Sequence, residues 1–454
     1  MIAKARSLWF EQALLPGGWA RRVRLSLDGC RIAAVERDVP QGPDDEAHGA
    51  ALPGLCNLHS HAFQRGMAGM AEVAGPAGDN FWTWREAMYL FVDRLTPQDS
   101  QAIAELAYAE MLETGFTRVG EFHYLHNDPE GRPYADPAEM AQGIAAAAQA
   151  TGIGLTLLPV FYAHANFGGA PPAPGQRRFI HDLDGFARLV EASRAAVAGL
   201  SDALVGVAPH SLRAVTPDEL AVVARLGDGP VHIHAAEQVK EVEDCLAWSG
   251  ARPVEWLLAN APVDARWCLV HATHMTADET RALAASGAVA GLCPVTEANL
   301  GDGVFPARDY LAAGGSFGVG TDSNVLIDAA AELRGLEYAQ RLVARSRNVA
   351  APGPGRSTGA ALFDAALAGG ARALGAEAGL REGAAADIVA LDLSHPSLAG
   401  RTGEALLDGW VFACRDNPVA AVWRRGRLVV SEGRHVCRGA IEARYREVLA
   451  RIAG

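Results

Sequence analysis

The central part of the chain alternates short, almost wholly apolar runs with longer segments rich in alanine, leucine and glutamate. Eight apolar runs follow one another: ALPGLCNLH (51–59), TRVGEFH (117–123), GLTLLPVF (154–161), LVGVAPH (204–210), PVHIHAAE (230–237), WCLVHATH (267–274), AVAGLCPV (288–295) and SFGVGTDS (316–323). Parallel strands covered on both faces have this apolar character, whereas half-buried strands alternate. Eight strand–helix units predict a (β/α)₈ barrel of the TIM type over residues 51–376. A doubly wound open sheet is the alternative that the same texture allows.

Both ends of the chain have a different pattern, in which apolar and polar residues alternate. The pattern covers residues 1–50, with LWFEQALL, ARRVRLSLDG and RIAAVERD, and residues 377–438, with ADIVALDL and PVAAVWRRGRLVVSEGR. A period of two with glycine-containing turns is typical of antiparallel strands. We predict that the two ends pair into one small β-sandwich, and that residues 439–454 form a C-terminal helix. The fold class is therefore α/β.

Composition narrows the kinds of partner. The chain has 40 basic and 53 acidic residues, a net charge of −13, which does not favour nucleic acid or an anionic membrane. No apolar stretch reaches the 18 residues of a membrane span, and we expect no signal peptide. Seven scattered cysteines without a C-x-x-C pair favour a reducing compartment. We therefore expect a cytoplasmic protein with a small-molecule partner.

Several apolar runs end in histidines or carboxylates. The carboxyl ends of barrel strands meet at one face, so these side chains converge although they are distant in sequence. His59 and His61 are two residues apart and point the same way from an extended strand. His234 and Asp322 end two other runs. Three imidazoles and a carboxylate predict a site for a divalent ion, most simply Zn²⁺, with Fe²⁺ and Mn²⁺ as alternatives.

Two features refine this metal site. His232 shares a face with His234, but Glu237 follows His234 by three residues, where a carboxylate reaches a metal-bound water. We therefore predict His234 as the ligand and place His232 deeper in the barrel. The chain has only two lysines, Lys4 and Lys240, and neither ends a run. Since a bridging carboxylated lysine is then absent, we expect one ion per chain.

The predicted site indicates hydrolysis at an sp² carbon. A divalent ion lowers the pKa of its water to about 7. Glu237 is placed to take the proton of that water and pass it to a leaving group. Asp322, a ligand with a spare oxygen, orients the water or accepts a proton, and His271 polarises the atom under attack. The substrate class at this point is an amide, an ester or a C=N compound.

The motifs around these residues resemble a known superfamily. LPGLCNLHSHAFQRG, HIHAAEQ, LVHATH and GTDSN resemble the amidohydrolase superfamily, in its mononuclear deaminase and chlorohydrolase branch. FWTWREAMY, GEFHYLH, PHSLRAV and CPVTEANLGDG are similar to the formimidoylglutamate deiminases. The resemblance implies hydrolysis of N-formimidoyl-L-glutamate to N-formyl-L-glutamate and ammonia in histidine degradation, and a homodimer.

The resemblance also implies a role for each site residue. It makes His59, His61, His234 and Asp322 the metal ligands, and Glu237, His271 and Asp322 the catalytic residues. The implied substrate-binding residues are Gln64, Arg85, Tyr124, His210 and Arg213. Because the arginine fork binds carboxylates at two points, Arg85 and Arg213 would supply local positive charge for a dicarboxylate amidine in an acidic protein.

Three alternatives stay open. The enzyme could deaminate an aromatic amidine such as guanine, in which case aromatic and amide groups should surround the site instead of two arginines. The chain could be a non-catalytic scaffold with the same fold, although such proteins usually lose metal histidines. Finally, the glycine- and proline-rich segment 164–179 is either a lid, which would bring the Arg177 and Arg178 side chains toward the substrate, or an inert insertion.

Overall fold

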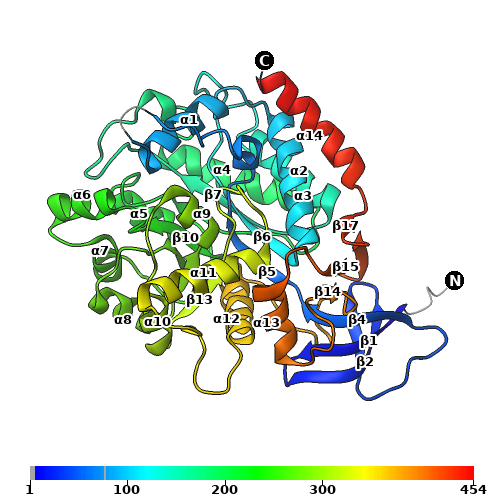
Figure 1. The fold of residues 1–454 in the computed structure, drawn as a ribbon. Helices are drawn as coiled ribbons and strands as arrows, with labels where there is room; N and C mark the ends of the chain where they lie inside the picture. Colours follow the sequence, from blue (N-terminus) through cyan, green and yellow to red (C-terminus); the bar gives the residue numbers. More distant parts are fainter. Residues whose placement is uncertain (1–5, 76–77, 454) are drawn as a thin grey trace.

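The computed structural model describes residues 6–75 and 78–453 (Figure 1). The strands are β1 Arg6–Leu15, β2 Gly18–Asp28, β3 Arg31–Glu36, β4 Glu46–Pro53, β5 Leu55–Ser60, β6 Phe116–His123, β7 Gly154–Phe161, β8 Leu204–Val205, β9 Ala208–Pro209, β10 Val231–Ala235, β11 Trp267–His271, β12 Val289–Leu292, β13 Ser316–Val319, β14 Ile388–Leu391, β15 Val419–Arg424, β16 Arg427–Ser431 and β17 Arg434–His435. The helices are α1 Phe81–Val92, α2 Pro97–Glu113, α3 Glu139–Thr151, α4 Leu183–Val197, α5 Pro217–Val223, α6 Val239–Ser249, α7 Pro253–Asn260, α8 Ala277–Ser286, α9 Pro294–Leu300, α10 Ala307–Ala312, α11 Ala329–Ala344, α12 Thr358–Ala373, α13 Glu404–Ala413 and α14 Arg438–Ala453, with short 3₁₀ turns η1 Ala62–Met67 and η2 Pro174–Gln176.

The eight predicted apolar runs form a closed parallel barrel. Strands β5, β6, β7 and β8 pair in that order, with β9 also on β7, and β10, β11, β12 and β13 form the other half. Bridges between Ser211 and His234 and between Ser60 and Asp322 join the halves on both sides. Every residue of β6, β7, β10 and β11 is buried, as expected for strands covered by helices. The barrel prediction is confirmed, and the open sheet is excluded.

The two ends of the chain pair as predicted. They form one eight-stranded sheet in the order β17-β16-β15-β14-β4-β1-β2-β3, seen below the C-terminal helix in Figure 1. Strand β14 pairs with β4, where Ile388 lies opposite Pro53. Only Gly54 separates β4 from the barrel strand β5, and a Cβ there would overlap the Thr117 side chain. All eight strands lie on one hydrogen-bonded path. That this sheet folds into a two-layered sandwich stays a prediction. The domain limits 1–50 plus 377–438, 51–376 and 439–454 also stay predictions.

The C-terminal helix α14 packs along α2 on the outside of the barrel (Figure 1). Arg438 lies 3.1 Å from Glu110 and 2.9 Å from Glu113, while Ile441 is buried in a cluster with Leu106 and Ala109. The helix is thus anchored by an ion-pair network at its start and by apolar contacts along its length. No helix among the described residues is long and apolar enough to cross a membrane.

Two neighbouring imidazoles outside the site, His126 and His181, lead to a prediction about acid stability. Their ring centres are 5.0 Å apart, and His126 Nε2–H donates to the Val160 carbonyl over 3.0 Å. Burial lowers the pKa of His126 well below its usual value, and it lowers the pKa of His181 to about 4. Both rings are therefore neutral in the folded protein at pH 5, whereas an unfolded chain protonates its histidines below about pH 6.5.

The sign of this linkage predicts lower stability in acid. As the pH falls below about 6.5, these histidines bind protons in the unfolded state but not in the folded state. Each histidine therefore lowers the free energy of unfolding by up to about 1.4 kcal/mol per pH unit. Denaturant unfolding between pH 7 and 5 should show that His126→Asn has a shallower decline in the free energy of unfolding than the wild type. Equal slopes would show that His126 is not neutral in the folded state.

Candidate active site

Four predicted metal ligands meet at the carboxyl ends of the barrel strands. His59 and His61 come from the end of β5, His234 comes from β10, and Asp322 follows β13. His59 Nε2 lies 3.2 Å from His61 Nε2 and 3.1 Å from His234 Nε2. Asp322 Oδ1 lies 3.2 Å from His61 Nε2 and 3.5 Å from His59 Nε2. All four residues are buried, so the barrel brings together the ligand set that the sequence predicts.

The protonation of these rings suits a cation. His61 Nδ1 contacts the Phe122 carbonyl at 2.9 Å, and His234 Nδ1 contacts the His210 carbonyl at 3.0 Å. A carbonyl only accepts hydrogen bonds, so the proton sits on Nδ1 and both Nε2 lone pairs face the cluster. A tetrahedral ion with Zn–N bonds of 2.0–2.1 Å would hold two such nitrogens about 3.3 Å apart. The donor set and its spacing fit one divalent ion.

The alternative donors lie elsewhere. His232 Nε2–H donates to the Ala373 carbonyl over 2.8 Å, which uses the ring in the barrel interior as predicted. Lys240 lies exposed on α6 and pairs with Asp244 at 2.8 Å. Lys4 is outside the described residues. No lysine of the described chain therefore reaches the cluster, which agrees with a single ion.

Backbone contacts hold Asp322 against the first ligand pair. His61 N–H donates to the Asp322 carbonyl and Asp322 N–H donates to the His59 carbonyl, both over 2.9 Å. Asp322 and His271 have φ angles of +46° and +67°, a left-handed conformation that is strained for residues other than glycine and recurs at functional sites. Burial alone would raise the pKa of Asp322, but its contacts with His59 and His61 outweigh burial and lower that pKa well below its usual value.

Glu237 and His271 face each other beside the cluster. His271 Nε2 lies 3.8 Å from Glu237 Oε1 and 3.8 Å from Asp322 Oδ2. Burial raises the pKa of Glu237, which makes its carboxylate a stronger proton acceptor. Burial would lower the pKa of His271, but the charges of Glu237, Glu297 and Asp322 outweigh it and raise that pKa to about 10. The arrangement can exchange protons and stabilise negative charge over the cluster.

One pocket is lined by the five predicted substrate-binding residues together with Glu237, His271 and Asp322. The five are Gln64, Arg85, Tyr124, His210 and Arg213.

Two arginines of this pocket stack on one aromatic ring. The guanidinium carbons of Arg85 and Arg213 lie 4.6 Å and 5.5 Å from the centre of the same Trp82 ring. Arg85 Nε and Arg213 Nε and Nη2 are buried without a hydrogen-bond partner among the described residues. The nearest carboxylate oxygen to Arg213 is Glu237 Oε2, at 3.6 Å. The pocket therefore holds two cations whose donors are free for an anionic ligand.

Amide and phenol groups complete the polar side of the pocket. Gln64 Nε2–H donates to Tyr124 Oη over 2.7 Å, and the Gln64 Oε1 atom is buried without a hydrogen-bond partner in the described structure. The Tyr124 ring centre lies 4.9 Å from that of His61. Gln64 thus offers an acceptor close to the predicted metal ligands, where an N–H group of a ligand can bind.

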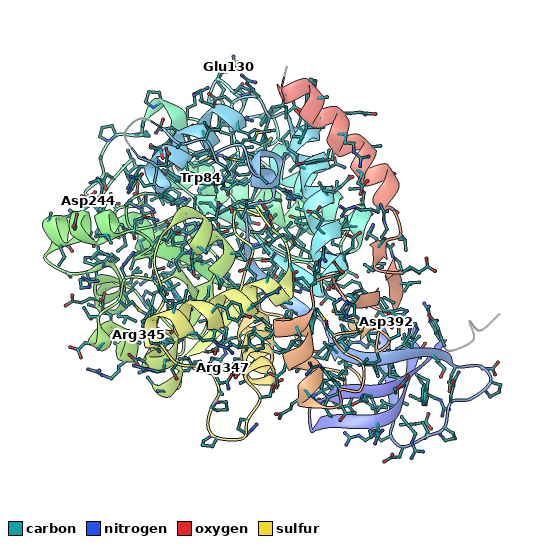
Figure 2. All side chains as sticks on the ribbon, in the orientation of Figure 1. Trp84, Glu130, Asp244, Arg345, Arg347 and Asp392 are labelled. Carbon is teal, nitrogen blue, oxygen red and sulfur yellow. The ribbon has the colours of Figure 1, made fainter. Side chains whose placement is uncertain are left out.

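Sequence reasoning did not find the aromatic wall of the pocket. Tyr89, Tyr162, Phe179 and Trp84 line it as well; Trp84, labelled in Figure 2, is a residue of α1. Tyr89 lies four residues after Arg85 on α1, and this helical spacing was the available signal.

The segment 164–179 contributes Phe179 to this wall, but its two arginines do not line the pocket and instead contact other parts of the chain. Arg178 is fully buried and donates to the carbonyls of Asn127 and Leu95 over 2.9 and 3.0 Å. Arg177 pairs with Asp93 at 2.8 Å. The hypothesis that these two side chains approach the substrate is therefore wrong.

Comparison with known proteins agrees with this site. The model of the amidohydrolase family matches residues 50–429, and the model of the N-terminal domain of formimidoylglutamate deiminase HutF matches residues 6–49. The formimidoylglutamate deiminase of Pseudomonas aeruginosa is 54% identical, over 94% of this chain and 95% of that protein. A crystal structure of an amidohydrolase from Brucella melitensis is 57% identical with a TM-score of 0.96, covering 99% of this chain and 100% of that one. A zinc-bound adenosine deaminase from Xanthomonas campestris shares the fold at 23% identity and a TM-score of 0.80, covering 98% of each chain. The chain belongs to the amidohydrolase family and, within it, to the formimidoylglutamate deiminases.

Proposed function

We propose that the protein hydrolyses N-formimidoyl-L-glutamate to N-formyl-L-glutamate and ammonia in histidine degradation. The observation that carries this substrate is the pair of arginines, Arg85 and Arg213, whose buried donors lack partners among the described residues of the pocket. The substrate has two carboxylates, and a guanidinium binds a carboxylate through two parallel hydrogen bonds. The relative of this chain from Pseudomonas aeruginosa is named for the same activity.

The metal in the proposal is a single divalent ion held by His59, His61, His234 and Asp322, most simply Zn²⁺ with Fe²⁺ or Mn²⁺ as alternatives. The proposal is supported by three imidazoles and one carboxylate whose ligand atoms all lie within 4.8 Å of one another. When bound, such an ion lowers the pKa of a water molecule to about 7 and so supplies a nucleophile at neutral pH. We expect a stoichiometry of one, because neither of the two lysines in the sequence follows a barrel strand and Lys240 is paired with Asp244 on α6.

The side chains of the pocket have different roles in this reaction. Arg85 and Arg213 hold the carboxylates, which orients the formimidoyl carbon toward the histidine–aspartate cluster. Glu237, within 3.8 Å of His271, takes a proton from the attacking water and delivers it to the terminal amidine nitrogen. A carbon–oxygen bond forms, and a second proton, from the hydroxyl group of the tetrahedral centre, passes through Asp322 to the same nitrogen. The carbon–nitrogen bond then breaks, the carbonyl of the formyl product forms, and ammonia leaves. His271, which contacts Glu297 through Nδ1, stabilises through its other nitrogen the negative charge that develops on the oxygen of the tetrahedral centre.

The second candidate is deamination of an aromatic aminoheterocycle such as guanine. The aromatic wall of Trp84, Tyr89, Tyr162 and Phe179 favours it, because flat rings stack on such residues. However, a neutral heterocycle would leave the buried donors of Arg85 and Arg213 without the carboxylate acceptors that they lack in the pocket, which is costly. The third hypothesis, a non-catalytic scaffold, conflicts with the complete ligand cluster.

One assay decides among these functions. Ammonia release should be measured with N-formimidoyl-L-glutamate and with guanine, alongside metal analysis of the same sample. We expect release from the first compound and one equivalent of metal per chain. Release from guanine alone would reject the proposed substrate, and no release from either compound in a metal-replete sample would favour the scaffold.

Arg85→Gln should raise KM for N-formimidoyl-L-glutamate about 10- to 100-fold, while kcat changes less than about threefold, because hydrogen bonds to a charged group contribute about 1.5–3 kcal/mol. Steady-state kinetics measure both constants. Arg177→Gln is the matched control, since Arg177 is paired with Asp93 and does not line the pocket. An unchanged KM in Arg85→Gln would remove this arginine from the substrate site.

A further inference from the structure

A buried carboxylate that the predicted mechanism does not use lies directly behind His271. Glu297 is on α9 and is 5% exposed. Its Oε1 atom lies 3.3 Å from His271 Nδ1. The same oxygen accepts a hydrogen bond of 2.9 Å from the Cys293 N–H, at the beginning of α9. Glu297 thus joins the first turn of this helix to the imidazole that faces the pocket.

This contact determines which nitrogen of His271 faces the pocket. An ionised carboxylate only accepts hydrogen bonds, so His271 Nδ1 carries the proton that Glu297 binds. The ring is then oriented with Nε2 toward Glu237 Oε1 and Asp322 Oδ2, each 3.8 Å away. Without an acceptor behind it, the ring would gain freedom to rotate away from this orientation. The Cys293 bond in turn fixes the carboxylate itself.

The same helical turn also holds the loop that carries Asp322. Thr296 Oγ1–H donates to the Thr321 carbonyl over 3.1 Å. Ser323 N–H donates to Thr296 Oγ1 over 3.3 Å. Thr321 and Ser323 are the two chain neighbours of Asp322. Adjacent residues of α9 therefore position two different groups of the site, one through a carboxylate and one through a hydroxyl.

We propose that Glu297 is a positioning residue of the deimination reaction, which holds the His271 ring in the orientation that presents Nε2 to the substrate. The proposal rests on the proposed function for its kinetic consequences, but its structural part concerns His271 alone. Loss of an outer partner of this kind typically lowers activity 10- to 100-fold.

Two variants of Glu297 and one control test this. Glu297→Met keeps the length of the side chain and removes the acceptor, whereas Glu297→Gln keeps an acceptor oxygen without the charge. Glu332→Gln is the matched control: Glu332 is another buried carboxylate, which accepts a hydrogen bond of 3.0 Å from Val295 N–H on the same turn. Among the described residues it has no bond to His271. The measurements are kcat and KM with N-formimidoyl-L-glutamate, metal content, and ¹⁵N-histidine NMR of the zinc-loaded protein, with the His271 signal assigned from His271→Asn.

We expect Glu297→Met to lower kcat about 10- to 100-fold with KM within about threefold and full metal content. Glu297→Gln should recover part of that loss, and Glu332→Gln should stay within about twofold of the wild type. In the wild-type spectrum His271 should carry a proton on Nδ1, and Glu297→Met should lose or shift that signal.

Three results would overturn the proposal: a wild-type His271 protonated only on Nε2, a Glu297→Met variant with kcat within about twofold of the wild type, or a kcat loss that follows metal loss. The spectrum of the wild type tests whether His271 Nδ1 carries the proton that Glu297 accepts, even if Glu297→Met fails to fold. If the wild type releases no ammonia from N-formimidoyl-L-glutamate, the proposed function fails, while the NMR measurement still decides whether Glu297 holds His271.

Discussion

Glu237→Gln should reduce kcat by about a thousandfold or more while the protein keeps its full metal content. General acid–base catalysis contributes about 10²- to 10⁴-fold, and glutamine cannot accept and return a proton. Glu237 is not one of the four clustered ligands, so its loss leaves them in place. Its own backbone N–H donates to Glu241 Oε2 over 3.1 Å, which keeps the chain at this position fixed in the variant.

The Glu237 measurement needs a comparison that changes charge without touching the pocket. Glu243→Gln provides it, because Glu243 is exposed on the neighbouring helix α6. Steady-state ammonia release and metal analysis of both variants are sufficient. A Glu237→Gln enzyme with a normal rate would remove this residue from proton transfer, and one without metal would show that it supports the ligands.

The metal cluster could be predicted from sequence because each of its members sits at a fixed place in a strand. An apolar run indicates a buried parallel strand, and the polar residues that end the run lie at the carboxyl edge of the barrel. His59 and His61 add the two-residue period of an extended chain. These rules need no knowledge of loops, and the structure indeed places Nε2 atoms of three strand-end histidines within 3.2 Å of a neighbour.

The parts that sequence reasoning missed depend on how loops return to the barrel. Glu297 contacts His271 because α9 begins close to the end of β11. The segment CPVTEANLGDG by itself does not indicate which strand end its side chains face. Arg178 lies in a glycine- and proline-rich loop in which its direction is not encoded by any period, and it binds backbone carbonyls in the interior. The predicted homodimer concerns a second chain and stays a prediction.

Removal of the metal should abolish activity, and loss of one ligand should do nearly the same. Without the ion, the pKa of the attacking water rises from about 7 back to about 15.7, and hydroxide is no longer formed at neutral pH. We therefore expect chelation to lower kcat at least about a thousandfold. Activity should return on addition of Zn²⁺. His234→Ala should lose bound metal and fall to a similar rate, because its Nε2 atom, 3.1 Å from His59 Nε2, is one of the converging donors.

The adjacent histidine of the same strand provides the control for His234. His232 points to the Ala373 carbonyl, 2.8 Å away, so His232→Asn removes an imidazole from β10 without removing a donor from the cluster. We expect this variant to unfold at a lower denaturant concentration, because a buried hydrogen bond is lost, yet to bind one equivalent of metal. Metal analysis and ammonia release separate the two cases. If His234→Ala retained its metal and its rate while His232→Asn lost both, the ligand on β10 would be His232, and the proton placed on His234 Nδ1, which directs Nε2 into the cluster, would be misassigned.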